Sequence, residues 1–387
     1  MPNSTKKQIL SIILETAGSV ILCTASLAIV LFLIAGLVFG SPDSGAAGLA
    51  ESVTIMDAFD SWFSLSKTEA AQAANTVPKH FWIESDAEVP PLPDQTRFGQ
   101  ASSPDELQWL LQDAAPLLDG QETTFGPDTE ILEGSVIHYY LDETILAITW
   151  KQVFSDFVYT ISEIKIQDPS QFRRYIANGE YNSNKLYYTT QMSQMNNAVV
   201  ASSADFYRNR SFGIVVYDRE VRKITLPSHA ETCFIDVNGD LLFTYRGELM
   251  DMESAQRYVD DNNVLFSLAF GPILIDNGQV VPVASYAIGE VHDPYPRAAL
   301  CQKDKLHYLV VIATAEGKHN RYTDVNTFAK NLATLGCQKA YTLDGGRTAT
   351  IAMNHQIINK VNYPEPRMTS DIIYFATALP NYSTTEE

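Results

Sequence analysis

The chain has 387 residues and a formal net charge of -19, and 45% of its residues are hydrophobic. That apolar fraction is enough to build a core, which excludes a globally disordered chain. A chain this acidic is repelled by phosphate backbones, so we expect no nucleic-acid partner.

The first predicted element is a membrane-spanning helix at residues 17–40. This segment carries no charged residue, and at about 1.5 Å per residue it is roughly 36 Å long, enough to cross a bilayer. Lys6 and Lys7 precede it, so the positive-inside rule places residues 1–16 in the cytoplasm and the remainder outside the cell. A cleaved signal peptide is the alternative, but its apolar core usually runs only about 7–15 residues. The sequence therefore predicts a single-pass protein of the cell membrane with an extracellular C-terminal domain.

An extracellular tether is predicted at residues 41–104. The segment is small, polar and acidic, and it ends in the proline-rich run VPPLPDQTRFGQASSP, a composition typical of linkers. A short helix is predicted within it at 54–74. Residues 105–131 form a helical lead-in, because SPDELQWLLQDAAPLL combines a helix start with spaced apolar residues.

From residue 132 the sequence becomes typical of strands. Predicted strands lie in SVIHYYLDETILAITW, FVYTISEIKI, AVVASSADFY, FGIVVYDREV, CFIDVNGDLLFTY and GPILIDNGQVV. Asn238-Gly239 and Asn277-Gly278, within the last two of these segments, predict hairpin turns. Helical periodicity occurs at 250–262 and 323–335, the second closed by Gly336. The excess of strands predicts an α+β fold, a large and mostly antiparallel mixed sheet with packed helices at 132–380. Residues 381–387 are then a C-terminal tail.

Cysteine usage predicts buried free thiols. Cys23 lies in the predicted membrane helix, which leaves Cys233, Cys301 and Cys337. Three cysteines cannot form a closed set of bridges, and their spacing matches no zinc motif. A single disulfide is the alternative outside the cell.

One strand is predicted to end in the turn Asp-Gly-Gly-Arg, within YTLDGGRTAT. Gly345 and Gly346 would let the backbone present consecutive N–H groups to a ligand, and Asp344 is suited to bind a sugar hydroxyl or a cation, or to act as a base. An ordinary Asp-Gly hairpin turn is the alternative. Similar polar breaks follow three other apolar runs: SSADFYRNRSFG with Asp205, HDPYPRAALCQ with Arg297, and VVIATAEGKHNRY with Glu316 and Lys318.

In their order and spacing these stretches resemble the phosphodiester glycosidase family. The matching segments are SSADFY, FGPILIDNGQVV, PRAAL, TAEGK, TLDGGRTAT and, before the last strand, Arg367 in PRMTSDIIYFAT. The resemblance covers roughly residues 132–380. It implies a hydrolase that cleaves a sugar-1-phosphodiester in glycans of a bacterial cell envelope or exopolysaccharide. The predicted membrane helix at residues 17–40 would anchor this hydrolase on the outside of the cell.

The resemblance also implies which residues form the site. Such a reaction needs cations on the phosphate and a carboxylate near the developing oxocarbenium ion or the attacking water. The candidate catalytic carboxylates are Asp344, Glu316 and Asp205, and which of them is base or nucleophile stays open. The candidate ligand-binding residues are Arg297, Arg367, Lys318, Gly345, Gly346, Arg347 and Thr348. No cofactor is required, and the sequence leaves a divalent cation open.

The chain also departs from the family pattern. Thr342 stands where the family usually has asparagine, Arg347 where it has a third glycine, and Glu316-Gly317-Lys318 where it has Asp-Gly-Arg. Loss of one oxyanion-type donor typically costs about 10²–10³ in rate. A second hypothesis is therefore a relative that binds glycans or envelope partners without turnover, and a third is an unrelated structural ectodomain.

Overall fold

The computed structural model describes the greater part of the chain after residue 87. The described residues are 88–205, 207–208, 213–225, 231–249, 251–283 and 293–379. The predicted membrane helix, the predicted helix at 54–74 and the predicted tail lie outside them. Within the described ranges, no helix is both long and apolar enough to span a membrane. The chain divides into two compact units, Met1–Lys79 and His80–Glu387, and every described element belongs to the second.

A nine-stranded sheet forms the central layer, and each of its strand pairs is antiparallel. In spatial order its strands are β1 (Phe98–Ala101), β2 (Ile137–Leu141), β3 (Ile145–Phe154), β4 (Phe157–Ile166), β15 (His307–Thr314), β14 (Arg297–Asp304), β16 (Lys339–Leu343), β12 (Ile273–Asp276) and β13 (Gln279–Val280). Strands β3, β4 and β15 are rich in β-branched and aromatic residues, which suit a sheet that is covered on both faces.

Three smaller sheets accompany the large one. The five-stranded sheet contains β18 (Gln356–Ile357), β17 (Ile351–Met353), β6 (Ala198–Ser203), β19 (Asp371–Ala376) and β5 (Phe172–Ile176). The three-stranded sheet contains β10 (Leu241–Thr244), β9 (Thr232–Asp236) and β11 (Val264–Leu268), and the two-stranded sheet contains β7 (Gly213–Tyr217) and β8 (Glu220–Thr225). Short 3-10 turns are η1 (Gln95–Arg97), η2 (Pro104–Leu107), η3 (Pro169–Gln171), η4 (Ala177–Gly179) and η6 (Gly346–Thr348).

Helices cover one face of the nine-stranded sheet. They are α3 (Gln108–Asp113), α4 (Ala115–Leu118) and α7 (Val325–Thr334). The apolar side of α7 packs into a core that includes Trp150, and Phe328 stacks on Tyr159 with ring centroids 5.9 Å apart. This burial is the main force that holds the helices on the sheet.

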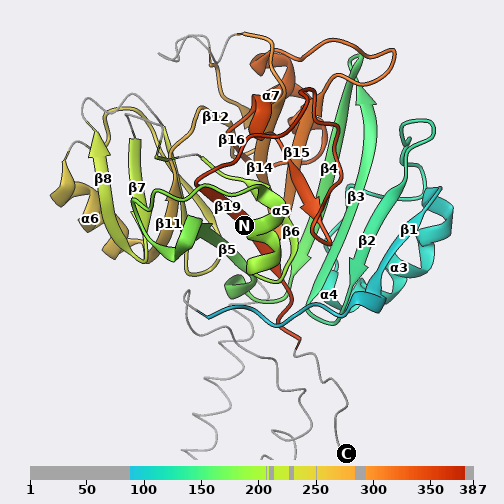
Figure 1. The fold of residues 1–387 in the computed structure, drawn as a ribbon, viewed down its shortest axis with the longest axis horizontal. Helices are drawn as coiled ribbons and strands as arrows, with labels where there is room; N and C mark the ends of the chain where they lie inside the picture. The colour runs from blue at the N-terminus through green and yellow to red at the C-terminus, as the bar shows by residue number, and fades with distance from the viewer. Residues whose placement is uncertain are drawn as a thin grey trace, which may run out of the picture. The chain divides into compact units, whose positions relative to one another are not determined.

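The opposite face of the nine-stranded sheet packs on the five- and three-stranded sheets. Phe172 of β5 lies in this interface, with its ring 4.7 Å from Phe375 and 5.0 Å from Tyr308. Outside these sheets lie α5 (Thr189–Met195), against β6 and β19, and α6 (Met252–Asp261), against β8 and β11. In Figure 1, β7, β8 and α6 lie on one side of β19 and β1 to β3 lie on the other.

The observed architecture confirms the predicted α+β class with a large antiparallel sheet. Asn238-Gly239 and Asn277-Gly278 form the turns β9–β10 and β12–β13, with both glycines at positive φ (79° and 73°). Gly336 ends α7 with φ 85°. Within the described part of the chain, Cys233, Cys301 and Cys337 are buried free thiols, as predicted.

The structure corrects the predicted tether at its end. Strand β1 lies within residues 41–104, yet it pairs with β2 as the edge of the nine-stranded sheet. The reason is that Phe98 packs on Tyr140, with ring centroids 4.6 Å apart, which fixes this segment to the core. No strand is predicted from the sequence at β5, where Arg173 and Arg174 interrupt the apolar pattern.

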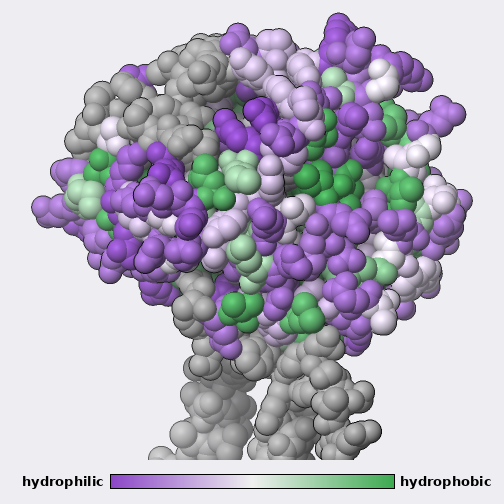
Figure 2. Space-filling view, in the orientation of Figure 1, coloured by the Kyte–Doolittle hydropathy of each residue, from purple (hydrophilic) through white to green (hydrophobic). Residues whose placement is uncertain are grey.

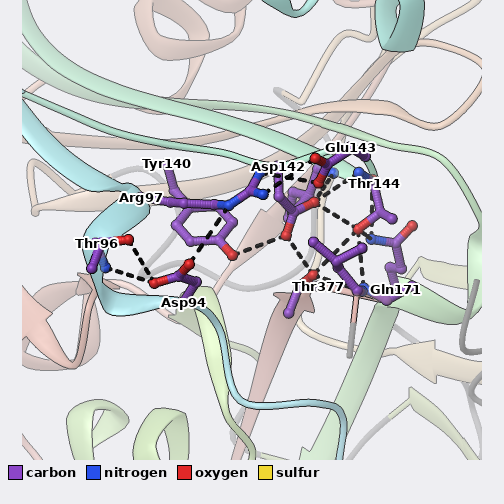
Figure 3. A network of polar contacts seen from close by, with 12 residues as sticks. Asp94, Thr96, Arg97, Tyr140, Asp142, Glu143, Thr144, Gln171 and Thr377 are labelled. Carbon is purple, nitrogen blue, oxygen red and sulfur yellow. Dashed lines mark hydrogen bonds and ion pairs between the residues drawn. The ribbon is translucent and has the colours of Figure 1, made fainter. Parts of the chain in front are cut away.

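A polar network with Asp142 at its buried centre joins the β2–β3 turn to the residue that follows β19 (Figure 3). Oδ1 of Asp142 accepts hydrogen bonds from the Thr144 amide, the Thr144 hydroxyl and the Ile145 amide, at 2.7, 2.8 and 3.0 Å. Its Oδ2 accepts from the hydroxyls of Tyr140 at 2.9 Å and Thr377 at 2.5 Å. The β2–β3 turn therefore holds the residue that follows β19. The face of the molecule seen in Figure 2 is, by contrast, mainly hydrophilic, with its hydrophobic residues in separate groups.

Replacement of Asp142 should destabilise the fold. In Asp142→Ala five donor groups lose their acceptor in a buried setting, and we expect the free energy of unfolding to fall by about 2–4 kcal/mol. Urea unfolding followed by tryptophan fluorescence measures this change. The control is Glu143→Ala, which removes the exposed ion pair with Arg97 and should cost about 1 kcal/mol or less. Equal losses in the two variants would contradict the assignment.

Candidate functional site

The Asp-Gly-Gly-Arg turn joins strand ends from two sheets. Immediately after β16, the amide of Asp344 donates a hydrogen bond to the carbonyl of Ala204, just after β6, at 2.8 Å. The amide of Gly346 donates to the carbonyl of Pro296, just before β14, at 2.8 Å. A Cβ at position 345 would lie 2.5 Å from that carbonyl oxygen. Glycine is therefore required at 345 by a close backbone approach.

These contacts change the role expected of the two glycines. The sequence predicted backbone N–H groups that face a ligand, but the Gly346 amide is bonded to Pro296. The hydroxyl of Thr348, also a predicted ligand group, is buried and donates to the Gly345 carbonyl at 2.7 Å. The glycines and Thr348 thus shape the turn, while the charged side chains beside it remain the candidates for ligand contact.

Asp344 carries the central carboxylate of the turn. It is 7% exposed, and its Oδ2 accepts a hydrogen bond from Nη2 of Arg367 at 2.7 Å. The Arg367 amide donates to the carbonyl of Arg347 at 2.9 Å, so the segment before β19 runs alongside the turn. The side chains of Arg367 and Arg347 are 42% and 45% exposed. The structure thus places two half-exposed guanidiniums beside one nearly buried carboxylate.

Arg297 approaches the same turn from β14. Its neighbour Ala298 pairs with Leu343, which places Arg297 level with the start of the turn. Its guanidinium donates to the Asp293 carbonyl and lies 6.0 Å from the centre of the Tyr295 ring. Burial lowers the pKa of this guanidinium. The contact between Pro296 and Gly346 locks this segment to the turn.

Asp205 lies beneath the turn in a fully buried ion-pair cluster. Its Oδ1 is 2.7 Å from Nη2 of Arg174, and the same nitrogen is 2.7 Å from Oδ2 of Asp371. The amides of Tyr207 and Ala269 donate to its two oxygens at 2.9 and 2.8 Å. Burial raises the pKa of Asp205 to about 7; Arg174 opposes the rise, and the second carboxylate adds to it. Because its oxygens face these partners, the geometry suits a positioning role beneath the site.

Glu316 and Lys318 line a different hollow. Both oxygens of Glu316 accept from Nζ of Lys151, at 3.0 and 2.9 Å. Together with His319, they line one wall of a pocket of about 640 Å³ whose other wall is formed by residues 130–133. The structure therefore groups Asp344, Arg367, Arg347, Arg297 and the two glycines around the turn, and it places Glu316 and Lys318 at the neighbouring end of β15.

A strap of residues 359–369 connects these two places. Asn362 forms a pair of hydrogen bonds with the backbone of Ala315, next to Glu316: the Ala315 amide donates to its Oδ1 at 3.2 Å, and its Nδ2 donates to the Ala315 carbonyl at 2.6 Å. Further along the strap, the guanidinium of Arg367 donates a hydrogen bond to the carboxylate of Asp344. At its end, Thr369 pairs with Tyr187. The strap therefore contacts both the Asp344 turn and the residue that precedes the pocket-lining Glu316.

Sequence reasoning missed several partners of the site. They are Arg174, Asp371, Lys151, Asn362 and Glu365. One sign was available, because Arg173 and Arg174 are charged residues between the apolar residues of a short strand, where buried partners are expected. Among the described residues, no group of three or more His, Cys, Asp and Glu side chains is arranged to hold a metal ion.

The cluster around Arg174 predicts a pH dependence of stability. The pKa of Asp205 is about 7 in the folded chain and about 3.9 in an unfolded one. The folded state therefore binds more protons between these values, and the stability that this group contributes falls as the pH rises from about 4 to about 7. In Asp205→Asn this titration is absent. Urea unfolding at pH steps from 4 to 8 should show the wild type losing stability relative to the variant, and parallel curves would refute this.

Comparison with known proteins links the site to a family. Residues 196–376, which include Asp205, Arg297, Glu316, Asp344 and Arg367, match the family described as phosphodiester glycosidase. No curated protein sequence matches the chain.

Three solved structures are similar at low identity. A hypothetical protein from Synechocystis is 14% identical with a TM-score of 0.46, and the match covers 64% of this chain and 64% of that one. The catalytic domain of zebrafish N-acetylglucosamine-1-phosphodiester alpha-N-acetylglucosaminidase, auto-inhibited by its pro-peptide, is 15% identical with a TM-score of 0.48, covering 67% and 92%. An exported protein from Burkholderia pseudomallei is 11% identical with a TM-score of 0.36, covering 57% and 74%. At these values we draw nothing about function from the structural likenesses.

The family match instead agrees with the resemblance carried by the ordered motifs of the sequence, and it supports a glycosidase-like function. The predicted resemblance is confirmed, because residues 196–376 match the model of the phosphodiester glycosidase family.

Proposed function

We propose that the chain hydrolyses a sugar-1-phosphodiester at the turn that carries Asp344. The observation that carries this proposal is the Asp344 carboxylate, 2.7 Å from Arg367 and next to the half-exposed Arg347, inside the region matched by the family. A phosphodiester needs cations for its phosphate and a carboxylate near the anomeric carbon. This turn supplies both kinds of group.

The two guanidiniums are suited to the phosphate. Arginine presents a planar fork of N–H donors that fits phosphate oxygens, and Arg347 and Arg367 are each accessible to solvent over nearly half of their side chains. When a phosphate oxygen takes the place of the carboxylate on Arg367, Asp344 is released toward the substrate. Arg297, held level with the turn, adds positive potential from the other side.

The proposed reaction is a displacement by water at the anomeric carbon. Asp344 accepts a proton from the attacking water, a carbon–oxygen bond forms, and the bond between the anomeric carbon and the phosphate oxygen breaks. The electron pair leaves on that oxygen, so the products are the free sugar and a phosphate monoester. Because the leaving phosphate ester is a weak base, the step needs little general-acid assistance. Asp205 acts here as a positioning residue, since it lies in the buried cluster beneath the turn.

The substrate and location are proposed from the sequence. The apolar segment 17–40 would anchor the chain in the cell membrane with the folded unit outside. The glycan would then be a component of the cell envelope or of an exopolysaccharide. The pocket beside Glu316 and Lys318 has room for sugar units beyond the scissile bond. The reaction as proposed needs no cofactor and no metal ion.

A second function is binding of the same ligands without turnover. It is favoured by Arg347, whose side chain stands where the family has a third glycine, and by the internal ion pair that occupies Asp344. A protein of this kind would retain sugar-phosphate ligands but release no product.

Release of free sugar, and its dependence on Asp344, distinguishes hydrolysis from binding without turnover. The full-length chain, supplied with sugar-1-phosphodiesters, should release free sugar, and Asp344→Asn should lower kcat by about 10²-fold or more because the proton acceptor is lost. Arg347→Ala should raise KM by about tenfold, as expected for a lost phosphate contact. Asp304→Asn, an exposed carboxylate on β14, serves as the control. Binding without any release of sugar in the wild type would establish the second function.

A further inference from the structure

We propose that Glu365 makes the site discriminate against phosphate monoesters, and so favours release of the reaction product over release of the substrate. The inference rests on the proposed function, in which Arg347 and Arg367 hold the phosphate. Glu365 lies outside the sequence motifs of the site and has no part in the chemical step. Its role would be to set which charge state of phosphate the two guanidiniums accept.

Each of the two guanidiniums faces a carboxylate of the chain itself. Arg367 is 2.7 Å from Asp344, and Nη2 of Arg347 is 3.7 Å from Oε1 of Glu365. The two carboxylates occupy the places that phosphate oxygens would take. They differ in setting, however, because the Glu365 side chain is 66% exposed and that of Asp344 only 10%. Glu365 can turn toward solvent when a ligand enters, but its charge stays at the rim.

The strap keeps Glu365 close to Arg347. Pro364 and Pro366 flank it, and each proline ring fixes its own φ and restricts the residue before it. The strap is tied down on both sides of this Pro-Glu-Pro unit, by Asn362 on Ala315 and by the Arg367 amide on the Arg347 carbonyl. A carboxylate on so short and stiff a segment remains near the phosphate site in every rotamer.

The substrate and the product differ in charge. A phosphodiester carries one negative charge, whereas a monoester loses a second proton with a pKa near 6 and carries nearly two at pH 8. A carboxylate roughly 6 Å from the phosphate in a water-like dielectric weakens binding by about threefold for each negative charge on the ligand. The dianionic product is therefore penalised about threefold more than the monoanionic substrate.

The test compares two small esters on the full-length chain. Phenyl phosphate and methyl phenyl phosphate present a monoester and a diester of similar size, and their Kd values are measured by calorimetry at pH 8 and pH 5. In Glu365→Gln the ratio of monoester Kd to diester Kd should fall about threefold at pH 8. At pH 5, where both ligands carry one charge, the ratio should be the same as in the wild type.

A matched control removes the same charge elsewhere. Glu253 on α6 is exposed and paired with Arg257 at 2.7 Å, so Glu253→Gln changes the net charge equally without touching the site. An unchanged ratio in Glu365→Gln, or an equal change in Glu253→Gln, would overturn the proposal, as would the failure of both esters to bind the wild type. Binding with the expected ratios but without sugar release in the turnover assay would leave the selectivity intact and refute only the hydrolytic function.

Discussion

The buried guanidinium of Arg174 is the interaction on which the site depends. It bonds the carboxylate that follows β6 and the carboxylate that opens β19, and it donates to the Ser267 carbonyl in β11. One cation therefore joins the five-stranded and three-stranded sheets. Loss of one partner from a buried pair typically costs about 3–5 kcal/mol. Because the Asp344 amide bonds to the residue that precedes Asp205, the position of the Asp344 turn follows from this cluster.

The site concentrates positive charge in a strongly acidic chain. With a net charge of -19, the protein as a whole repels anions, and long-range attraction cannot bring a phosphate to it. In the proposed function, a phosphate ligand would therefore be recognised by short-range contacts, which Arg347 and Arg367 can make at the surface and which salt screens only in part. Asp344 and Glu365 pair with these two arginines. Their carboxylates are consistent with short-range recognition, because they keep the guanidiniums oriented while no ligand is bound.

The sequence predicts the elements of the fold better than it predicts the contacts within the site, and the difference has physical causes. Strand β4, helix α7 and the Asn-Gly turns follow from local patterns, namely β-branched runs, apolar periodicity and residues that tolerate positive φ. The order of motifs also singled out Asp344 and Arg367, which the structure joins in an ion pair. The partners of Asp205 and Glu316 could not be found in this way, because Arg174 and Lys151 reach them only through the packing of distant strands. The hydrogen bond from the Gly346 amide to the Pro296 carbonyl is likewise a tertiary contact that no local pattern encodes.

The close approach of Gly345 to Pro296 has a consequence for how such a sequence can change over time. A Cβ at 345 would collide with the backbone rather than with a side chain, so no substitution at a neighbouring position can make room by becoming smaller. Only a different backbone path before β14 would accommodate it. The segments around Pro296 and Gly345, almost fifty positions apart in the sequence, are thus expected to be inherited together or to diverge together.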